Sequence, residues 1–257
     1  MSDELVIAGR KFRSRLMLGT GKYKTFEIMK DALDASGCGI VTVAVRRVNL
    51  DKPQGKSLLD YIDKNKYLIL PNTAGCCNVD EAVRIARLGR AAGLTNWIKL
   101  EVIADPKYLF PDPIATIEAA KILVKEGFVV LPYTTDDITV AKKLAEIGCA
   151  TIMPGASFIG SGQGVPNCEK IKLIRRYVSV PVVVDSGIGC ASDAAVAMET
   201  GADACLINTA VAEAENPALM AEAMKLAVEA GRKSFLSGRM PMREYASASS
   251  PVQGVSR

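Results

Sequence analysis

A lysine and a glutamate stand two residues apart inside the apolar segment NWIKLEVI, residues 96–103. Side chains of a strand alternate between its two faces, so Lys99 and Glu101 share one face. The apolar side chains around them take the other face: Ile98, Leu100 and Val102. Burial favours the free amine of a lysine, and the free amine attacks a ketone to form an imine. A nearby carboxylate favours the charged ammonium instead, but it can exchange the protons that imine formation needs. A salt bridge that fills a core layer is the structural alternative, and the pair alone leaves both open.

A second candidate site lies in three glycine-containing or polar segments. Asp185 ends the apolar run VVVD, and SGIG follows it with Gly187 before a helix-forming segment. Such a backbone nest at a helix N-terminus binds phosphate. The run ACLI is followed by Asn208 and Thr209, and the loop IGSGQG begins near Gly160. Together with Lys99, these segments indicate an imine-forming enzyme for a small phosphorylated carbonyl compound.

The composition excludes several other classes of site. The chain of 257 residues contains no histidine, so Ser-His and Cys-His nucleophiles and His-ligated metals are excluded. The seven cysteines have no C-x-x-C spacing, which is typical of buried thiols in a reducing compartment. We expect no metal site and a cytoplasmic protein, because the start MSDELVIAGRKFRSR has no long apolar leader segment.

Charge and hydropathy limit the partners. Lysine and arginine number 32 against 28 aspartates and glutamates, and no basic run interleaved with aromatics is present, so nucleic acid is not expected. No uninterrupted apolar run is long enough to span a membrane. The small positive excess suits small anionic substrates.

Eight short apolar, β-branched runs recur along the chain and predict the elements that position these residues. They lie at 15–21, 39–47, 67–75, 96–103, 128–135, 150–157, 181–189 and 204–211. Amphipathic segments separate most of them, and several end at a glycine typical of a helix C-terminus: Gly93, Gly127, Gly148 and Gly201. The pattern predicts a (β/α)₈ barrel, with an open doubly wound sheet as the alternative.

We expect one domain over residues 1–257. The segment LVIAGRKF, residues 5–12, is predicted to be a strand or hairpin that caps the N-terminal end of the barrel. The polar tail from about residue 246 is predicted to be flexible. In a barrel the catalytic side chains gather at the C-terminal ends of the strands, and phosphate commonly binds after strands seven and eight.

Seven motifs, in order along nearly the whole chain, resemble those of bacterial thiazole synthase, which assembles the thiazole ring of thiamin. They are VRRVNL, LPNTAGC, WIKLEVI, IGSGQG, VVVDSGIG, NTAVA and SGRMPMREYASASSP. The resemblance implies a (β/α)₈ barrel that forms a homotetramer. It implies that Lys99 forms an imine with 1-deoxy-D-xylulose 5-phosphate, with Glu101 and Asp185 as acid and base. The implied sugar phosphate contacts are Gly160, Ser186, Gly187, Asn208 and Thr209.

The resemblance also implies the other reactants. Sulfur would arrive as a thiocarboxylate on a small ubiquitin-like carrier protein, and condensation with dehydroglycine would close the ring, without a metal or nucleotide cofactor. Two stretches depart from the family pattern. MPGASFIGSG replaces a proline-leucine-glycine-X-proline form before the glycine loop, and Ser186 stands where many members have alanine.

Rival interpretations remain at this stage. A class I aldolase would share the barrel, the lysine and the phosphate loops, and a non-catalytic phosphosugar-binding barrel would keep the loops alone. Arg46 and Arg47, after the second strand, are open between contact with substrate or carrier and a salt bridge to a neighbouring loop. The tail from about Tyr245 is open between a disordered terminus and a segment that orders around the carrier.

Overall fold

Eight parallel strands form a closed barrel in the computed structural model, which describes residues 3–47 and 57–250. The strands are β3 (Leu16–Gly19), β4 (Ile40–Ala44), β5 (Leu68–Asn72), β6 (Trp97–Leu100), β7 (Val129–Thr134), β8 (Met153–Pro154), β9 (Val183–Asp185) and β10 (Ala204–Ile207). Their order is β8-β7-β6-β5-β4-β3-β10-β9, and parallel bridges from Ile152 to Val182 and from Gly155 to Asp185 join the two ends. The predicted barrel is therefore confirmed, and the open sheet was wrong.

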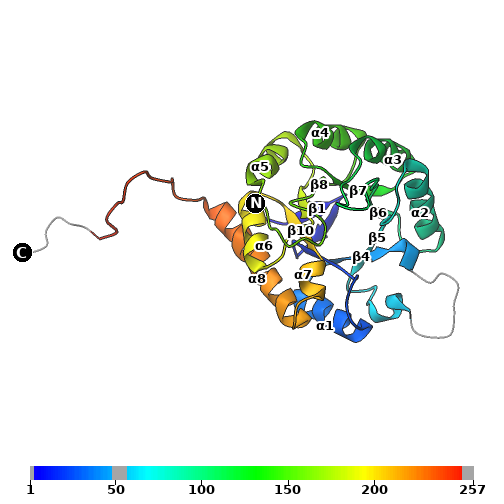
Figure 1. Ribbon diagram of the computed structural model, residues 1–257, viewed down its shortest axis with the longest axis horizontal. Helices are drawn as coiled ribbons and strands as arrows, with labels where there is room; N and C mark the ends of the chain where they lie inside the picture. Colours follow the sequence, from blue (N-terminus) through cyan, green and yellow to red (C-terminus); the bar gives the residue numbers. More distant parts are fainter. Residues whose placement is uncertain (1–2, 48–56, 251–257) are drawn as a thin grey trace, which may run out of the picture.

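Helices surround the strands as an outer ring (Figure 1). They are α1 (Phe26–Ser36), α2 (Val79–Ala91), α3 (Pro113–Lys125), α4 (Ile138–Ile147), α5 (Cys168–Tyr177), α6 (Ala191–Glu199), α7 (Thr209–Ala212) and α8 (Pro217–Ser237). The four glycines predicted at helix ends all have positive φ angles. Between β4 and β5 the described residues form two 3₁₀ turns, η1 (Val45–Arg47) and η2 (Leu58–Tyr61), in place of an α-helix. Residues 48–50 of the motif VRRVNL lie outside the described part of the chain.

The two faces of each strand build two separate cores. Ile98, Leu100 and Val102 pack in the outer core, between the barrel and the helices. Trp97 packs in the inner core, on the face that it shares with Lys99. This arrangement confirms the predicted alternation, which directs Lys99 and Glu101 into the barrel.

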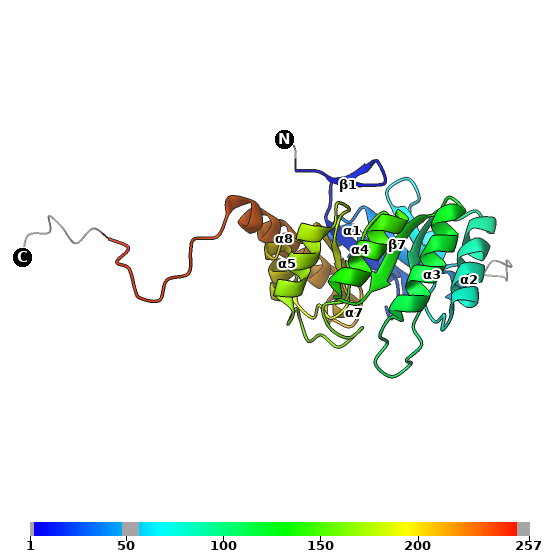
Figure 2. The ribbon, with the colours of Figure 1, turned by 90° about the horizontal axis from the view of Figure 1, so that it is seen from above.

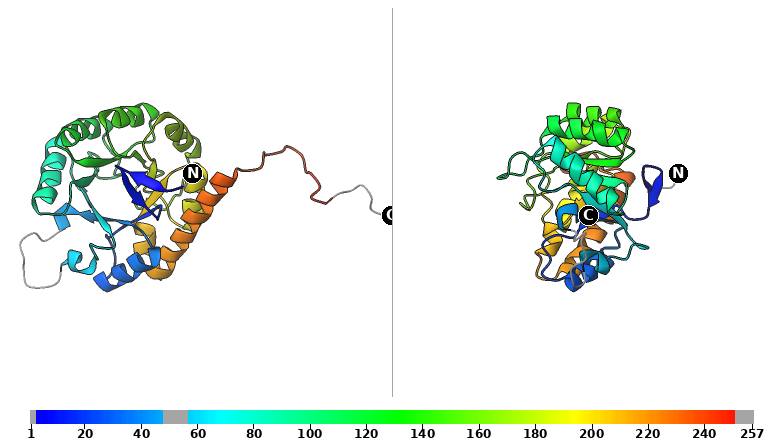
Figure 3. Two further views of the ribbon diagram at one scale, coloured as in Figure 1. Left: turned by 180° about the vertical axis from the view of Figure 1, so that it is seen from behind. Right: turned by 90° about the vertical axis from the view of Figure 1, so that its right-hand side faces the viewer.

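An N-terminal hairpin closes one end of the barrel. Strands β1 (Leu5–Ile7) and β2 (Arg10–Phe12) pair antiparallel, and Ala8 and Gly9 both have positive φ angles, which suits a two-residue hairpin turn. Leu5, Ile7 and Phe12 are buried in the inner core, where the Phe12 ring meets the edge of Trp97 at 6.0 Å between centroids. Figures 2 and 3 show the hairpin at the end of the barrel opposite the loops that follow the strands. The predicted cap is confirmed.

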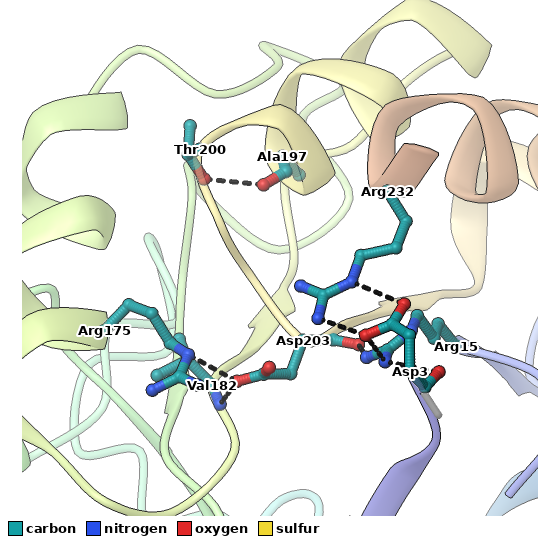
Figure 4. Close-up of polar contacts among 8 residues, drawn as sticks. All are labelled: Asp3, Arg15, Arg175, Val182, Ala197, Thr200, Asp203 and Arg232. Carbon is teal, nitrogen blue, oxygen red and sulfur yellow. Dashed lines mark hydrogen bonds and ion pairs between the residues drawn. The ribbon is translucent and has the colours of Figure 1, made fainter. Parts of the chain in front are cut away.

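An ion-pair network joins the N-terminal segment to the barrel and to α8 (Figure 4). The carboxylate of Asp3 pairs with Arg15 at 2.9 Å and with Arg232 at 2.6 Å. Arg15 also donates to the carbonyl oxygen of Asp203 at 2.7 Å, and the side chain of Asp203 pairs with Arg175 at 2.9 Å. Four distant parts of the chain are thus connected at the closed end.

The tail leaves the barrel after α8 (Figure 1). Residues 239–250 are exposed and contain no helix or strand, while residues 251–257 lie outside the described part, so the flexibility expected from about residue 246 stays a prediction. Among the described residues, no helix has the length and apolar character needed to cross a membrane.

Candidate functional site

Lys99 lies between two carboxylates inside the barrel. Its Nζ atom is 2.9 Å from Oε1 of Glu101 and 2.7 Å from Oδ2 of Asp185. The three side chains are only 5 to 7% exposed, so the ions are held away from bulk water. Lys99 lies in strand β6, Glu101 is the first residue after that strand, and Asp185 is the last residue of β9. The geometry thus brings together the three residues that the resemblance named as imine former, acid and base.

Without substrate, the charges of this triad favour a protonated Lys99 between two carboxylates. Burial opposes the charge on Lys99, but the carboxylates of Asp185 and Glu101 outweigh it and raise the pKa of the lysine above its ordinary value. Burial raises the pKa of Asp185, although the adjacent ammonium counteracts it. Of the two opposing effects anticipated for the lysine, the electrostatic one is therefore larger. A free amine at Lys99 requires transfer of its proton to a neighbour.

Thr73 positions Glu101, and the sequence reasoning missed it. Its hydroxyl donates to the carbonyl oxygen of Glu101 at 2.7 Å and accepts from the amide of Glu101 at 2.8 Å. The amide of Thr73 also donates to the carbonyl oxygen of Lys99 at 3.2 Å. Thr73 is fully buried in the loop after β5, which neighbours β6. A hydroxyl residue just after the adjacent strand, in the motif LPNTAGC, was the available signal.

A cavity of about 830 Å³ lies over the triad, at the C-terminal ends of the strands. All eight predicted site residues line it: Lys99, Glu101, Gly160, Asp185, Ser186, Gly187, Asn208 and Thr209. The closed hairpin end is on the other side of the barrel (Figure 2). The structure therefore brings the predicted reacting groups and the predicted phosphate loops into one space.

The loops after β8 and β9 are packed against each other at Gly187. Gly187 has a φ of 76°, and a Cβ atom there would lie 2.0 Å from Oγ of Ser157. The carbonyl oxygen of Gly187 accepts from the amide of Gly164 at 2.9 Å. The hydroxyl of Ser186 donates to the carbonyl oxygen of Ser157 at 2.8 Å, so it holds the β8 loop instead of facing a ligand. The departure at Ser186 thus has a structural role.

The stretch MPGASFIGSG nevertheless delivers Gly160 to the cavity. Phe158, within this departure from the family pattern, contacts two exposed aromatic rings of the loop after β6, one edge-on and one tilted. Its ring centroid is 5.3 Å from that of Tyr108 and 5.1 Å from that of Phe110. The two loops therefore meet at the rim of the barrel through aromatic contacts.

The free backbone donors differ from those expected at a helix N-terminus. The amides of Gly189 and Cys190, just before α6, donate to the carboxylate of Asp193 at 2.9 and 3.1 Å, so these two donors are already engaged. The amides of Gly160 and Gly187 donate no hydrogen bond to any other residue that the structure describes. Both glycines line the cavity, so their amides are candidates for binding an anion.

Asn208 lies against the glycines at the end of β3. A Cβ atom on Gly19 would lie 2.6 Å from Cβ of Asn208, so the glycine makes room for this side chain. The Oδ1 atom of Asn208 is buried and has no hydrogen-bond partner among the described residues. A buried amide oxygen without a partner favours a ligand donor at this point.

Arg46 and Arg47 differ in their surroundings. Arg46 pairs with Glu81 at 3.0 Å and contacts Sγ of Cys76 at 3.5 Å, which matches the salt-bridge interpretation. Arg47 lines the cavity and makes no ion pair with the residues that the structure describes. Both arginines line the cavity, so contact with substrate or carrier stays a prediction for each of them.

The fold and site define a class: a (β/α)₈-barrel enzyme whose ionisable groups meet at the C-terminal ends of the strands. The family model described as thiazole biosynthesis protein ThiG matches residues 6–251. The chain belongs to this family of thiazole synthases.

Individual relatives agree with this assignment. The thiazole synthase of Solibacter usitatus is 59% identical over 256 residues, which cover 99% of both chains. The bifunctional protein ThiO/ThiG of a Nostoc species is 56% identical over 261 residues, covering 99% of this chain and 40% of that one. Among solved structures, the BexX/CysO complex of Amycolatopsis orientalis matches with a TM-score of 0.84 and 34% identity, covering 94% of this chain and 98% of that one. The predicted resemblance is confirmed, and the class I aldolase is not favoured.

Proposed function

We propose that this chain builds the thiazole of thiamin from 1-deoxy-D-xylulose 5-phosphate, dehydroglycine and sulfur from a carrier protein, through an imine on Lys99. The observation that carries the proposal is the buried lysine between Glu101 and Asp185, in a chain of the thiazole synthase family. The reaction needs no metal or nucleotide, because the two carboxylates and the amine supply the acid, the base and the nucleophile.

The first step generates the amine. Lys99 transfers a proton to Asp185, whose raised pKa makes it a better acceptor than an ordinary aspartate. The amine then adds to the ketone carbon of the sugar, the resulting alcohol loses water, and the imine forms. Asp185 returns its proton to the oxygen of the adduct. Glu101, a carboxylate at 2.9 Å on the other side, takes a proton from the nitrogen of the adduct and passes it to the departing hydroxyl group, so that water leaves and the protonated imine forms.

The second step moves the carbonyl along the sugar. The protonated imine acidifies the neighbouring carbon, and a carboxylate of the triad removes its proton. Return of the proton to the former ketone carbon leaves a carbonyl one position further, where sulfur can add. Both carboxylates remain within reach of Lys99, so one site serves every proton transfer.

The phosphate end of the substrate would lie at the loops after β8, β9 and β10. Gly160 and Gly187 line the cavity with amides that have no acceptor among the described residues, and Thr209 lines the same end. The unpartnered Oδ1 atom of Asn208 accepts only, so it would take a hydrogen bond from a sugar hydroxyl, while the Nδ2 group can donate to the phosphate. Ser186 would contribute its backbone, because its hydroxyl is bonded to Ser157. These contacts are neutral, and phosphate commonly binds at this sector of (β/α)₈ barrels.

The sulfur donor would be a ubiquitin-like carrier whose C-terminal thiocarboxylate enters through the mouth of the cavity. The structural relative from Amycolatopsis orientalis, a BexX/CysO complex, supports a protein partner for this fold. The exposed rings of Tyr108 and Phe110 at the rim offer apolar surface to such a partner.

The homotetramer and the cytoplasmic location are also part of the proposal. Leu219, Leu226 and Leu236 on α8 are each more than half exposed, which favours coverage of this helix by a second subunit. All seven cysteines are free, which suits a reducing compartment. Light scattering on the purified chain measures the subunit number directly.

The test is mass spectrometry of the intact chain after incubation with 1-deoxy-D-xylulose 5-phosphate and borohydride. We expect one reduced adduct, mapped to Lys99 and absent from Lys99→Ala. Product formation that depends on the thiocarboxylate carrier and dehydroglycine then separates the synthase from an aldolase, which would cleave the sugar without either. A folded chain without an adduct, or with an adduct on another residue, would contradict the imine.

A further inference from the structure

Lys22 stands at the phosphate end of the cavity, where the sequence reasoning placed no cation. It belongs to the segment GTGKY after β3 and lines the cavity. Its φ angle is 70°, in the left-handed region that a lysine seldom adopts. Backbone strain of this kind collects at functional sites, where the surrounding structure holds a side chain in a required place.

The ammonium of Lys22 lies over the glycine loop. A Cβ atom on Gly160 would lie 3.6 Å from Nζ of Lys22 and 3.6 Å from Oγ1 of Thr209. The ammonium and the hydroxyl therefore flank the same glycine, whose amide is free and which has no side chain to separate them. They belong to the segments that follow two adjacent strands, because β3 pairs with β10. A tetrahedral anion on the Gly160 amide would be within reach of both.

The present partner of Lys22 is a weak one. Its Nζ atom is 2.9 Å from Oε1 of Glu213, and the two side chains are 49 and 58% exposed. Exposed pairs of this kind contribute little to stability, so the pair does not account for the strained backbone. Glu213 follows Thr209 by one helical turn, with its amide bonded to the carbonyl oxygen of Thr209 at 2.9 Å. The carboxylate thus lies beside the phosphate loops.

The other cations that line the cavity are engaged or approach a different part of it from the Gly160 loop. Lys99 is held by two carboxylates and Arg46 by Glu81. Arg47 approaches Gly21, where a Cβ atom would lie 3.7 Å from Nη1 of this arginine and 3.2 Å from Nδ2 of Asn208, so it lies on the Asn208 side of the phosphate end. The atoms nearest a Cβ on Gly160 belong to Lys22 and Thr209. A phosphate dianion held only by neutral amides and hydroxyls would keep most of its charge unbalanced.

We propose that Lys22 is the counter-ion of the substrate phosphate, and that its ammonium group is paired with Glu213 until the substrate binds. The inference rests on the proposed function, since it assigns the phosphate of that substrate to this end of the cavity. Binding exchanges the Lys22–Glu213 pair for a Lys22–phosphate pair, and the released carboxylate turns to solvent. A dianion competes well with one exposed carboxylate, because its charge is larger and the free Gly160 amide adds a second contact.

The experiment compares Lys99 trapping by borohydride with 1-deoxy-D-xylulose 5-phosphate and with unphosphorylated 1-deoxy-D-xylulose. The central variant is Lys22→Gly, because glycine accepts the left-handed backbone and removes only the amine. We expect its trapping efficiency with the phosphate ester to fall roughly tenfold or more, the loss expected for one charged contact. Efficiency with the unphosphorylated sugar should not change, and the melting temperature should not fall.

Two further variants sharpen the result. Lys22→Arg should restore most of the efficiency, since it returns the charge. Glu213→Gln should lower the concentration of phosphate ester needed for half-maximal trapping, because the competitor is removed. Inorganic phosphate should raise the melting temperature of the wild-type chain, and it should raise that of Lys22→Gly less. This readout does not depend on catalysis.

Three outcomes would overturn the assignment. They are equal losses with both sugars in Lys22→Gly, no loss with either, or weaker phosphate-ester binding in Glu213→Gln. A wild-type chain that prefers the phosphate ester while Lys22→Gly keeps the full preference refutes Lys22 but leaves the proposed function intact. A wild-type chain that forms no adduct with either sugar refutes the proposed function and this role with it.

Discussion

Lys99 and Asp185 meet across the interior of the barrel, with Nζ 2.7 Å from Oδ2, although 86 residues separate them. Asp185 is held by the β8 segment, because its carbonyl oxygen accepts from the amide of Ala156 at 3.0 Å and its strand bridges to Gly155. The pair therefore depends on closure of the barrel between β8 and β9. The reactive geometry is a property of the whole fold, whereas the Lys99–Glu101 contact is local to one strand.

Removal of one carboxylate should lower the pKa of Lys99. In the wild-type chain the pKa lies above its ordinary value, so the amine fraction rises beyond the amount formed by transfer to Asp185 only at alkaline pH, and the rate of borohydride trapping rises with it. In Glu101→Gln the rising limb should move to lower pH by about one unit or more. Trapping rate against pH measures this shift. Glu126→Gln, which breaks a helix-surface pair with Arg87, is the control and should leave the limb in place; an unmoved limb in Glu101→Gln would show that this carboxylate does not hold the charge.

Thr73→Val should impair catalysis without touching a reacting group. Valine keeps the shape but leaves the amide of Glu101 buried without an acceptor, which costs about 1–3 kcal/mol of unfolding free energy. We expect kcat to fall by roughly tenfold, in the range seen for loss of a supporting contact. Thr73→Ser keeps the hydroxyl and should retain most of the stability and most of the kcat. Steady-state kinetics with thermal unfolding decides, and full activity in Thr73→Val would remove the positioning role.

Gly187→Ala should damage the phosphate end of the cavity. An added Cβ atom overlaps Ser157 and must push the β8 loop, so we expect a higher KM for the phosphorylated substrate and a lower melting temperature. Gly93→Ala is a matched control, since Gly93 has nearly the same φ, 75° against 76°, and nothing within 4 Å of the added atom. It should be destabilised by about 1–2 kcal/mol while its kinetics stay unchanged. Equal kinetics in the two variants would mean that the close approach has no functional effect.

Asp3→Asn should make the chain less stable at neutral pH but not in acid. The hydrogen bond from Arg232 is the largest influence that lowers the pKa of Asp3 below its ordinary 3.8, and Arg15 adds to it. A carboxyl with a depressed pKa contributes stability above its unfolded value and loses it as the pH falls through the folded value. The difference in melting temperature between wild type and Asp3→Asn should therefore shrink below about pH 4. If the difference in melting temperature stays constant from pH 7 to pH 3, the ion pairs of Asp3 do not contribute to the stability of the chain.

The strands and the inward direction of the reactive pair were predictable because they follow from local rules. Alternation along NWIKLEVI places Lys99 and Glu101 on one face, and burial of the opposite face in the outer core selects which face is inward. The hairpin was predictable for the same reason, since Ala8 and Gly9 separate two short runs with buried apolar ends.

The polar contacts between loops were not predictable from the sequence. Thr73, Lys22 and the hydroxyl of Ser186 contact residues 28, 191 and 29 positions away, at Glu101, Glu213 and Ser157. No periodicity reports such contacts, because they depend on the paths of loops that only the closed barrel brings together. The bonds from the Gly189 and Cys190 amides to Asp193 were not predictable either, because a glycine-containing segment before a helix equally fits an external anion.

Closure of the barrel by the N-terminal hairpin has a kinetic consequence. Leu5, Ile7 and Phe12 fill the interior at the hairpin end of the barrel. Substrates must therefore enter, and product must leave, at the opposite end. Under the proposed function, a carrier seated at that mouth blocks the passage for small molecules. The sugar phosphate must then enter before the carrier docks, and the carrier must dissociate before the product escapes. Steady-state rates should accordingly obey a compulsory order of addition, with excess carrier acting as an inhibitor of turnover.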